Sequence, residues 1–139
     1  DLFKKKYKNY LLQERIFGRE LTVPILDQQV LPAIEIISQN KIYDYEAKYV
    51  MGMSKHVLNP KLPESVHTKL TEMALSIHNL LGCRVMSRSD FLLSGTKLYY
   101  LETNTLPGMT STSLFPESAA SVGIGFTKLI DKIIRLSLK

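Results

Sequence analysis

The chain has one cysteine, no tryptophan and no hydrophobic run long enough to cross a bilayer among its 139 residues. A single cysteine, Cys83, excludes an internal disulfide and is typical of a reducing compartment, so we expect a cytoplasmic protein without a membrane partner. Cys83 follows Gly82 at the predicted start of a strand. We therefore interpret its thiol as a small core group rather than as a nucleophile.

The sequence also lacks the two common glycine-rich phosphate motifs, because neither GxxxxGK nor GxGxxG occurs in it. Its net charge is +5, but the basic residues are scattered except for one run from Lys4 to Lys8. That run belongs to no recognised nucleic-acid-binding motif. We interpret it as a solvated helix end and expect no nucleic-acid partner.

Two β-rich runs stand near the start of the chain, at 21–26 and 30–37, and we predict that they pair as antiparallel strands. Pro24 and Pro32 interrupt these runs and favour edge or bulged positions, since proline cannot donate to a sheet ladder. With the helices predicted further along, the runs indicate an α+β fold, a mostly antiparallel sheet with packed helices.

Helical periodicity begins after a loop through Asn59-Pro60. Pro63 opens a helix that Gly82 ends, and its apolar residues recur at steps of three and four: Val66, Leu70, Met73, Ala74, Ile77, Leu80 and Leu81. A shorter helix is predicted over 117–122. A last helix begins near Thr127 and is expected to bury Leu129, Ile130, Ile133, Ile134 and Leu136.

The three histidines are not predicted to bind a metal. His67 and His78 lie off the apolar stripe of the first helix, and His56 lies in the loop before it. A histidine metal site needs close spacing and further ligands, which this arrangement does not offer. We interpret all three as surface residues.

The most informative stretch runs from Arg88 to Leu114. We predict a β-hairpin in which residues 85–93 pair with residues 98–103, with the turn at Ser94-Gly95. If Asp90 falls opposite Glu102, then Arg88 falls opposite Asn104, and the alternation of strands puts all four side chains on one face. Two carboxylates and an amide oxygen then converge beside an arginine, which favours a hard cation such as Mg²⁺ next to an anion.

A plainer interpretation of the same residues is the solvent-facing side of an amphipathic hairpin with an incidental salt bridge. The segment that follows argues against it. Residues 105–114 carry no charge and many hydroxyls, and the Pro107-Gly108 turn can aim backbone N–H groups inward. Such a loop could receive an anionic substrate beside the metal.

Four segments, taken in order, resemble the D-alanine–D-alanine ligase family of ATP-grasp enzymes. They are Gly18-Arg19-Glu20, Tyr43-Asp44-Tyr45-Glu46-Ala47-Lys48-Tyr49, Arg88-Ser89-Asp90 and Glu102-Thr103-Asn104-Thr105-Leu106-Pro107-Gly108-Met109-Thr110. The resemblance extends from about Tyr10 to the C-terminus. It implies the C-terminal ATP-grasp subdomain of an enzyme of peptidoglycan precursor synthesis, with residues 1–139 as the C-terminal part of a longer ligase.

The resemblance implies that the N-terminal domain and the first half of the ATP-binding domain are absent from this chain. They would therefore be partners of these residues within the same enzyme. D-alanine and ATP are the implied substrates, and a homodimer is left open as a further assembly.

Nucleotide contacts are implied for the segment before the first strand. In the family, residues matching Gln13, Glu14, Arg15 and Ile16 pass along the adenine, and the glutamate matching Glu20 binds the ribose hydroxyls. A carboxylate accepts two O–H donors well, which fits Glu20. Gln13 stands where the family usually has a glutamate for the adenine amino group, and its amide oxygen can still accept that bond. Lys48 resembles the lysine that contacts the ATP phosphates, and Tyr49 resembles a tyrosine that orders a loop over the active site.

The implied catalytic groups lie in the hairpin and the loop after it. Two Mg²⁺ ions, or Mn²⁺ in their place, would be bridged by Glu102 and completed by Asp90 and Asn104. Arg88 and the Gly108 N–H would hold the oxyanion of a tetrahedral intermediate. The second substrate's carboxylate would be bound by Ser113 and the Leu114 N–H.

Ser89 departs from the family pattern, which has an apolar residue between that arginine and aspartate. Its side chain should face the core, where a hydroxyl is expected to lower stability locally. Two alternatives stay open for the whole chain. One is a related ligase that joins D-alanine to another D-residue or a hydroxy acid, and the other is a non-catalytic remnant or interaction module.

Overall fold

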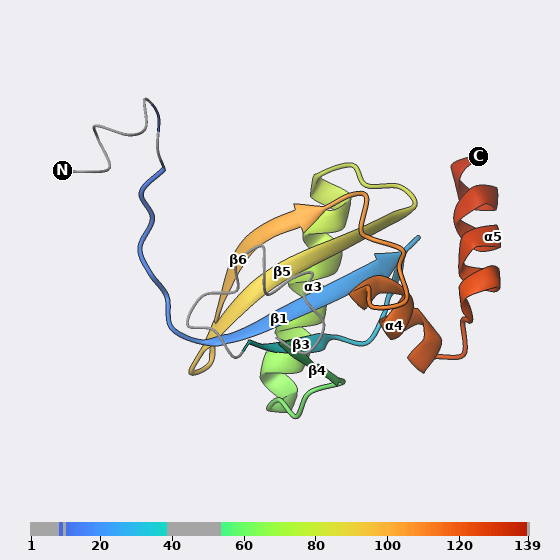
Figure 1. The fold of residues 1–139 in the computed structure, drawn as a ribbon. Coiled ribbons are helices and arrows are strands. Elements are labelled where there is room, and N and C mark those ends of the chain that lie inside the picture. Colours follow the sequence, from blue (N-terminus) through green and yellow to red (C-terminus); the bar gives the residue numbers. More distant parts are fainter. Residues whose placement is uncertain (1–8, 10, 39–53, 139) are drawn as a thin grey trace.

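The computed structural model describes residues 9, 11–38 and 54–138, and its centre is an antiparallel sheet with helices on both faces (Figure 1). The strands run in the order β4-β3-β1-β5-β6, and β2 pairs with the end of β1. Their bounds are β1 Arg19–Leu26, β2 Gln29–Val30, β3 Ile34–Ser38, β4 Ser54–Leu58, β5 Met86–Ser94 and β6 Lys97–Asn104. The helices are α3 Glu64–Leu80, α4 Leu114–Ser121 and α5 Phe126–Ser137. The predicted α+β class is confirmed.

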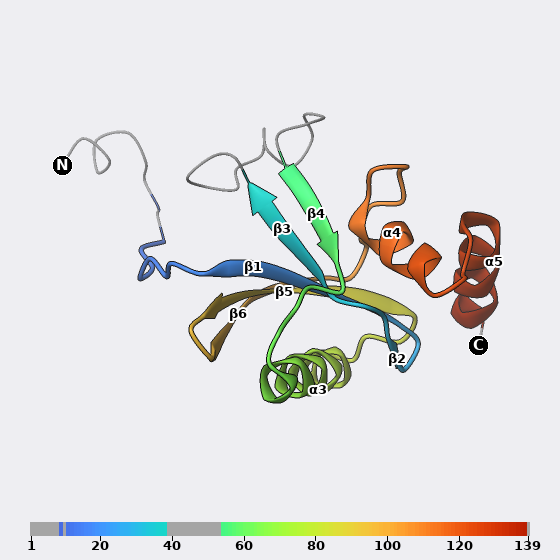
Figure 2. The ribbon, with the colours of Figure 1, turned by 90° about the horizontal axis from the view of Figure 1, so that it is seen from below.

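Helices α3 and α4 lie on opposite sides of the sheet, and α5 lies beyond α4 at one end (Figure 2). In the described part of the chain, none of the helices combines the length and the apolar character that a membrane span requires.

Strand β1 lies inside the sheet, between β3 and β5, and its register with β5 is unbroken, so the predicted edge or bulged position was wrong for Pro24. β3 pairs with β1 only at Glu20 to Thr22, and β2 pairs only at Ile25 and Leu26. Pro24 falls in the interval between them, where its carbonyl accepts a hydrogen bond from the Leu31 N–H (2.9 Å). A missing N–H therefore interrupts no ladder there.

The second predicted strand is divided in two by Pro32, so 30–37 is not one continuous element. β2 ends at Val30, and β3 begins at Ile34. A further strand, β4, occupies 54–58, where the sequence predicted a loop, and it pairs with β3.

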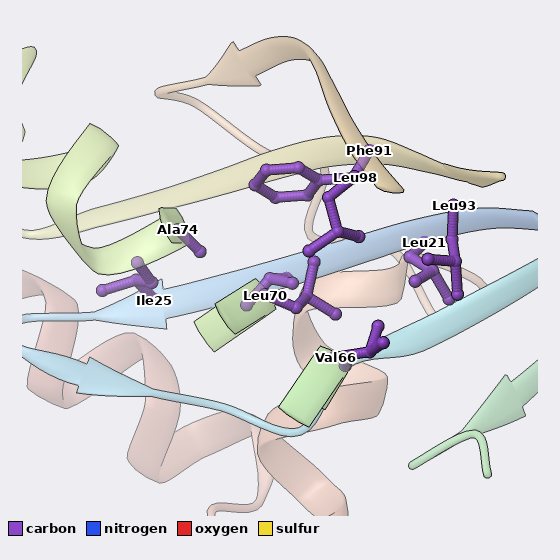
Figure 3. Packing of buried hydrophobic residues seen from close by; sticks show 10 residues of the cluster. Leu21, Ile25, Val66, Leu70, Ala74, Phe91, Leu93 and Leu98 are labelled. Atoms are coloured by element: carbon purple, nitrogen blue, oxygen red, sulfur yellow. The ribbon is translucent and has the colours of Figure 1, made fainter. Parts of the chain in front are cut away.

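The main core lies between α3 and the sheet (Figure 3). Alternate residues of β1 meet the buried stripe of α3 and the inner side of the hairpin; its fully or nearly buried members include Leu21, Val23, Ile25, Val66, Leu70, Ala74, Phe91, Leu93 and Leu98. Because strand side chains alternate, residues 20, 22 and 90 point to the opposite face. The sheet face opposite α3 is therefore not part of this core.

The predicted stripe of α3 was wrong at its C-terminal end. Leu80 is 86% exposed and Leu81 is 55% exposed, whereas His78, predicted at the surface, is fully buried. The His78 Nδ1 lies 2.7 Å from the Ser87 hydroxyl on β5. Near its C-terminal end, helix α3 therefore packs on the sheet through His78, which contacts Ser87 of β5. The predicted leucines at 80 and 81 do not make this contact.

His78 should make the fold sensitive to mild acid. Burial lowers the pKa of His78 below its ordinary value of 6.5, with an opposing influence from Asp27. Its Nε2 is buried and has no hydrogen-bond partner within the described residues. Below pH 6.5, His78 is protonated in the unfolded chain but stays neutral in the folded chain. The free energy of unfolding therefore keeps its full value above that pH and decreases as the pH falls below it.

We expect His78→Asn to flatten this dependence, because asparagine can keep the Ser87 bond but does not titrate. The free energy of unfolding, measured in urea from roughly pH 8 to 5, should lose up to about 1.4 kcal/mol per pH unit more in the native chain than in the variant. His67→Asn, in the same helix and only half-buried, is the control. Equal slopes for the native chain and His78→Asn would show that His78 is not buried in its neutral form.

A second core joins α4 and α5 to the end of β1. It contains Leu26, Leu31, Phe115, Ala119 and Leu129. Of the apolar residues predicted to be buried by the last helix, only Leu129 is buried, and Ile134 is 54% exposed. The prediction that this helix buries all five residues was therefore wrong for Ile134, whereas Ile133 and Leu136 are partly buried against this core.

Candidate active site on strands β5 and β6

The hairpin has the register that brings the predicted polar groups together. Asp90 pairs with Glu102 and Arg88 pairs with Asn104, as predicted. Closer to the turn the register differs, because Phe91 pairs with Tyr100 and Leu101 falls between the two registers as a β-bulge. The turn itself is Gly95-Thr96, one residue later than predicted, and Gly95 has a φ of 60°. The bulge is what makes a tight turn compatible with the Asp90–Glu102 pair.

Asp90 is the most constrained group on this face. Its side chain is nearly buried, and the Thr22 hydroxyl donates to Oδ1 at 2.5 Å. Arg88 reaches both carboxylate oxygens, with Nε donating to Oδ1 and a terminal nitrogen to Oδ2, each at 3.1 Å. The Arg88 guanidinium therefore forms an ion pair with Asp90 in this structure, and its role toward a reacting oxyanion stays a prediction.

Glu102 and Asn104 lie on the outer strand of the same face. Glu102 is exposed, and Asn104 is half-buried. The Asn104 Oδ1 accepts a hydrogen bond from the Leu106 N–H (2.9 Å), which fixes the side chain at the start of the loop. Thr22, which holds Asp90 from the neighbouring strand, was not predicted. Its position two residues after Glu20 on an alternating strand was the available signal.

The donor chemistry of this face fits a hard cation. Within the described residues no three His, Cys, Asp or Glu side chains gather as a metal site. The predicted set, however, has two carboxylates and one amide, and oxygen donors of this kind suit Mg²⁺. A carboxylate has about four lone-pair positions, so Asp90 keeps acceptor capacity beside its bonds to Thr22 and Arg88.

The loop after β6 is organised around Ser113. Its hydroxyl accepts from the Thr110 N–H (3.0 Å) and lies 2.8 Å from the Thr110 hydroxyl. Gly108 is exposed, and a Cβ there would lie 2.9 Å from the Ser113 Oγ. Leu114 begins α4 and is buried against Ile34 and Ile36. The structure thus brings Gly108 close to Ser113, and Ser113 directly precedes helix α4.

The predicted nucleotide segment leads into β1. Gln13, Glu14 and Arg15 are exposed, and Ile16 is half-buried. Gly18 makes a close approach to the hairpin, because a Cβ there would lie within 2.8 Å of the Leu93 carbonyl carbon. Glu20 follows in β1, opposite Leu92 and on the same face as Thr22 and Asp90.

Two predicted residues, Lys48 and Tyr49, lie outside the described residues. Ser89, predicted to face the core at some cost in stability, is fully buried there, but its hydroxyl is 2.7 Å from that of Thr103. The predicted core-facing position is confirmed, and because the buried hydroxyl has a partner, the cost in stability should be smaller than that of an unpaired hydroxyl.

A second unpredicted contact ties α4 to the sheet. The His56 Nδ1 lies 2.8 Å from a Glu117 carboxylate oxygen, and both side chains are partly buried. His56 lies in β4 and not in a loop, so its prediction as a surface loop residue was wrong.

This α+β domain, with paired carboxylates and an arginine beside a hydroxyl-rich loop, is of the ATP-grasp class. The family model described as "D-ala D-ala ligase C-terminus" matches residues 2–135. The chain belongs to this D-alanine–D-alanine ligase family.

Individual relatives agree with the family assignment. The chain is 42% identical over 135 residues to the D-alanine–D-alanine ligase of Desulforamulus reducens, covering 95% of this chain and 43% of that protein. It is 46% identical over 132 residues to the ligase of Geobacter sulfurreducens, covering 93% and 42%. The chain therefore spans less than half the length of the relatives it matches.

Solved structures of the same class have the same fold. The D-alanine–D-alanine ligase of Bacillus anthracis complexed with ATP superposes with a TM-score of 0.76 at 37% identity, covering 89% of this chain and 41% of that one. A D-Ala:D-Ser ligase from Enterococcus faecalis gives a TM-score of 0.71 at 28% identity, covering 88% and 37%.

Proposed function

We propose that this chain is the C-terminal catalytic part of an ATP-dependent D-alanine–D-alanine ligase that supplies the dipeptide for peptidoglycan in the cytoplasm. The observation that carries the proposal is the shared face of Asp90, Glu102, Asn104 and Arg88 in a chain of this family. The remainder of the enzyme would supply the opposite wall of the nucleotide site and most of the first-substrate pocket.

The proposed reaction has two steps. A carboxylate oxygen of the first D-alanine attacks the γ-phosphorus of ATP, the bond to the β-phosphate oxygen breaks, and ADP leaves with an acyl phosphate formed. The amino group of the second D-alanine, having lost a proton, then attacks the acyl carbon. The nitrogen of the tetrahedral adduct loses a second proton, and collapse of the adduct expels inorganic phosphate and leaves the peptide bond.

Residues of this chain would stabilise the negative charge that develops in each step. Arg88 lies against Asp90, and a planar guanidinium has the fork geometry that suits an anion. With the Gly108 N–H, it would stabilise the oxyanion of the adduct. Ser113 and the Leu114 N–H would orient the second D-alanine through its carboxylate, since the backbone N–H groups at the start of a helix favour an anion.

Glu102 would bridge two Mg²⁺ ions, with Asp90 and Asn104 each completing one shell. When bound, the metal would neutralise the phosphate oxygens during transfer. Mn²⁺ suits the same oxygen donors. Thr22 would orient Asp90 for this role, because its hydroxyl donates to Oδ1 from the neighbouring strand.

Nucleotide contacts would come from the segment that enters β1. The backbone of 14–16 and the Gln13 amide would contact adenine, and Glu20 would accept from the ribose hydroxyls. The exposure of Gln13 and Glu14, and the position of Glu20 on the same face as Asp90, support this arrangement. Lys48 would contact the phosphates and Tyr49 would order the loop over them.

We predict that the chain by itself does not make the dipeptide. Without an opposite wall, water stays in the site and the reactants lose the positioning that supplies much of the rate. The purified chain, given ATP, Mg²⁺ and D-alanine, should release no substrate-dependent phosphate. Coupled formation of phosphate and D-alanyl-D-alanine by the chain alone would contradict this prediction.

A chimera tests the function itself. It joins the N-terminal part of the Geobacter sulfurreducens relative to this chain, at the start of the matched region. Supplied with D-alanine, D-serine and D-lactate together, it should yield D-alanyl-D-alanine as the main product. The likeness to a D-Ala:D-Ser ligase makes D-alanyl-D-serine the alternative result. A folded chimera with no ligase activity would favour a non-catalytic remnant.

A further inference from the structure

The core side of the hairpin carries a row of hydroxyls directly beneath the proposed metal ligands. Ser89 lies between Arg88 and Asp90 in β5, and Thr103 lies between Glu102 and Asn104 in β6. Ser89 and Thr103 are register partners, and their hydroxyl oxygens are 2.7 Å apart. This one side-chain contact therefore joins the two strands at the backbone positions that separate the four site residues.

The contact is extended to the edge of the sheet by Tyr100. Its hydroxyl donates to the Thr103 Oγ1 at 3.0 Å, and its ring meets Phe91 edge-on with centroids 5.8 Å apart. Tyr100 and Thr103 lie on either side of the bulge at Leu101. The three hydroxyls of Ser89, Thr103 and Tyr100, here called the hydroxyl pin, thus span the irregular part of the register.

The location of the pin matters because a strand register can slip. A shift of one residue would move Glu102 and Asn104 to the core side and bring Thr103 out, since side chains alternate between faces. A β-bulge disrupts the ladder locally, so fewer backbone hydrogen bonds fix the register there. Ser89 is fully buried, so breaking its bond to Thr103 leaves a buried hydroxyl without that partner.

We propose that Ser89, Thr103 and Tyr100 are positioning residues that hold Asp90, Glu102 and Asn104 in the register needed to bind a divalent cation. This inference rests on the proposed function of the opposite face. The pin does not touch the metal or the substrates. It acts through the backbone of β5 and β6, as supporting groups around metal ligands commonly do.

The test uses the chain itself and two readouts. Ser89→Ala and Thr103→Val each remove one hydroxyl, and Thr103→Ser keeps it as the conservative rescue. Mn²⁺ binding, followed by the electron paramagnetic resonance signal of the free ion, should weaken by about tenfold in Ser89→Ala and Thr103→Val, the scale typical of supporting residues. Thr103→Ser should bind Mn²⁺ like the native chain.

Ser87→Ala is the matched control. Ser87 is also in β5, faces the same core and is fully buried, but its hydroxyl bonds to His78 of α3 rather than to β6. Its loss should lower the free energy of unfolding without changing Mn²⁺ affinity. If Ser87→Ala weakens Mn²⁺ binding as much as Thr103→Val does, the effect is general destabilisation and the proposal is wrong.

Amide hydrogen exchange along the hairpin tests the pin without any metal. Exchange at Asp90, Glu102 and Asn104 should accelerate in Thr103→Val and remain native in Thr103→Ser. If the native chain binds no Mn²⁺, the proposed metal site is contradicted. The exchange data would then show by themselves whether the hydroxyl pin holds the register. Native exchange at these three amides in both Ser89→Ala and Thr103→Val would overturn it.

Discussion

Glu102→Gln in the chimera is expected to reduce dipeptide synthesis by about three orders of magnitude, since a metal supplies several kcal/mol of charge stabilisation and each 1.4 kcal/mol is tenfold in rate. Glutamine keeps the size of the side chain but removes the negative charge that would bridge the two ions. Glu102 is exposed opposite Asp90, so the fold should tolerate the change. Initial rates over a range of Mg²⁺ concentrations measure the effect.

The control for this substitution is Glu72→Gln. Glu72 is also exposed but lies on α3, on the far side of the sheet from Glu102. It should leave the rate and its Mg²⁺ dependence unchanged. If Glu102→Gln turns over like the native chimera at limiting Mg²⁺, Glu102 is not a metal ligand.

The second large effect is expected at Arg88. Arg88→Ala should lower turnover by about 10²–10³, the scale for losing one preorganised donor to an oxyanion. Arg88→Lys should restore only part of the rate, because an ammonium lacks the planar fork that contacts both Asp90 oxygens at 3.1 Å. Arg135, whose exposed ion pair with Asp131 is 2.7 Å long, is the matched control and should tolerate alanine.

The structure requires a second readout at this position. Arg88 also neutralises the nearly buried Asp90, so its removal leaves a carboxylate without that partner and should lower the free energy of unfolding. A catalytic role predicts that Arg88→Lys folds with near-native stability but remains slow. Full activity of Arg88→Lys would mean that the arginine serves only the fold.

The shared face of Arg88, Asp90, Glu102 and Asn104 could be predicted from the sequence because strand alternation is a local rule. Arg88 and Asp90 are two positions apart, as are Glu102 and Asn104, so each pair shares a face in any strand. The pairing of Asp90 with Glu102 needed more, since the two-residue turn at Gly95-Thr96 would place it out of register without the bulge at Leu101. The hairpin pattern posed this pair only as a condition, and the structure shows the bulge that satisfies it.

The errors came from contacts that join distant parts of the chain. His78 appears polar in a helical pattern, and only its contact with Ser87 makes its burial favourable. Pro24 resembles an edge residue until β2 and β3 are seen to leave a gap opposite it. The partner of the buried Ser89 hydroxyl is known only once Thr103 is found across the strand pair. Each outcome depends on a partner whose identity the local sequence does not contain.

Transfer of heavy oxygen from D-alanine to phosphate tests the central claim most directly. In the chimera, D-alanine with both carboxylate oxygens labelled should pass one labelled oxygen to each inorganic phosphate released, because the carboxylate attacks phosphorus and that oxygen leaves with the phosphate. The label should appear in phosphate in step with dipeptide, and both should fall together in Glu102→Gln. Dipeptide formed with unlabelled phosphate would contradict the acyl-phosphate route and the role given to this face of the hairpin.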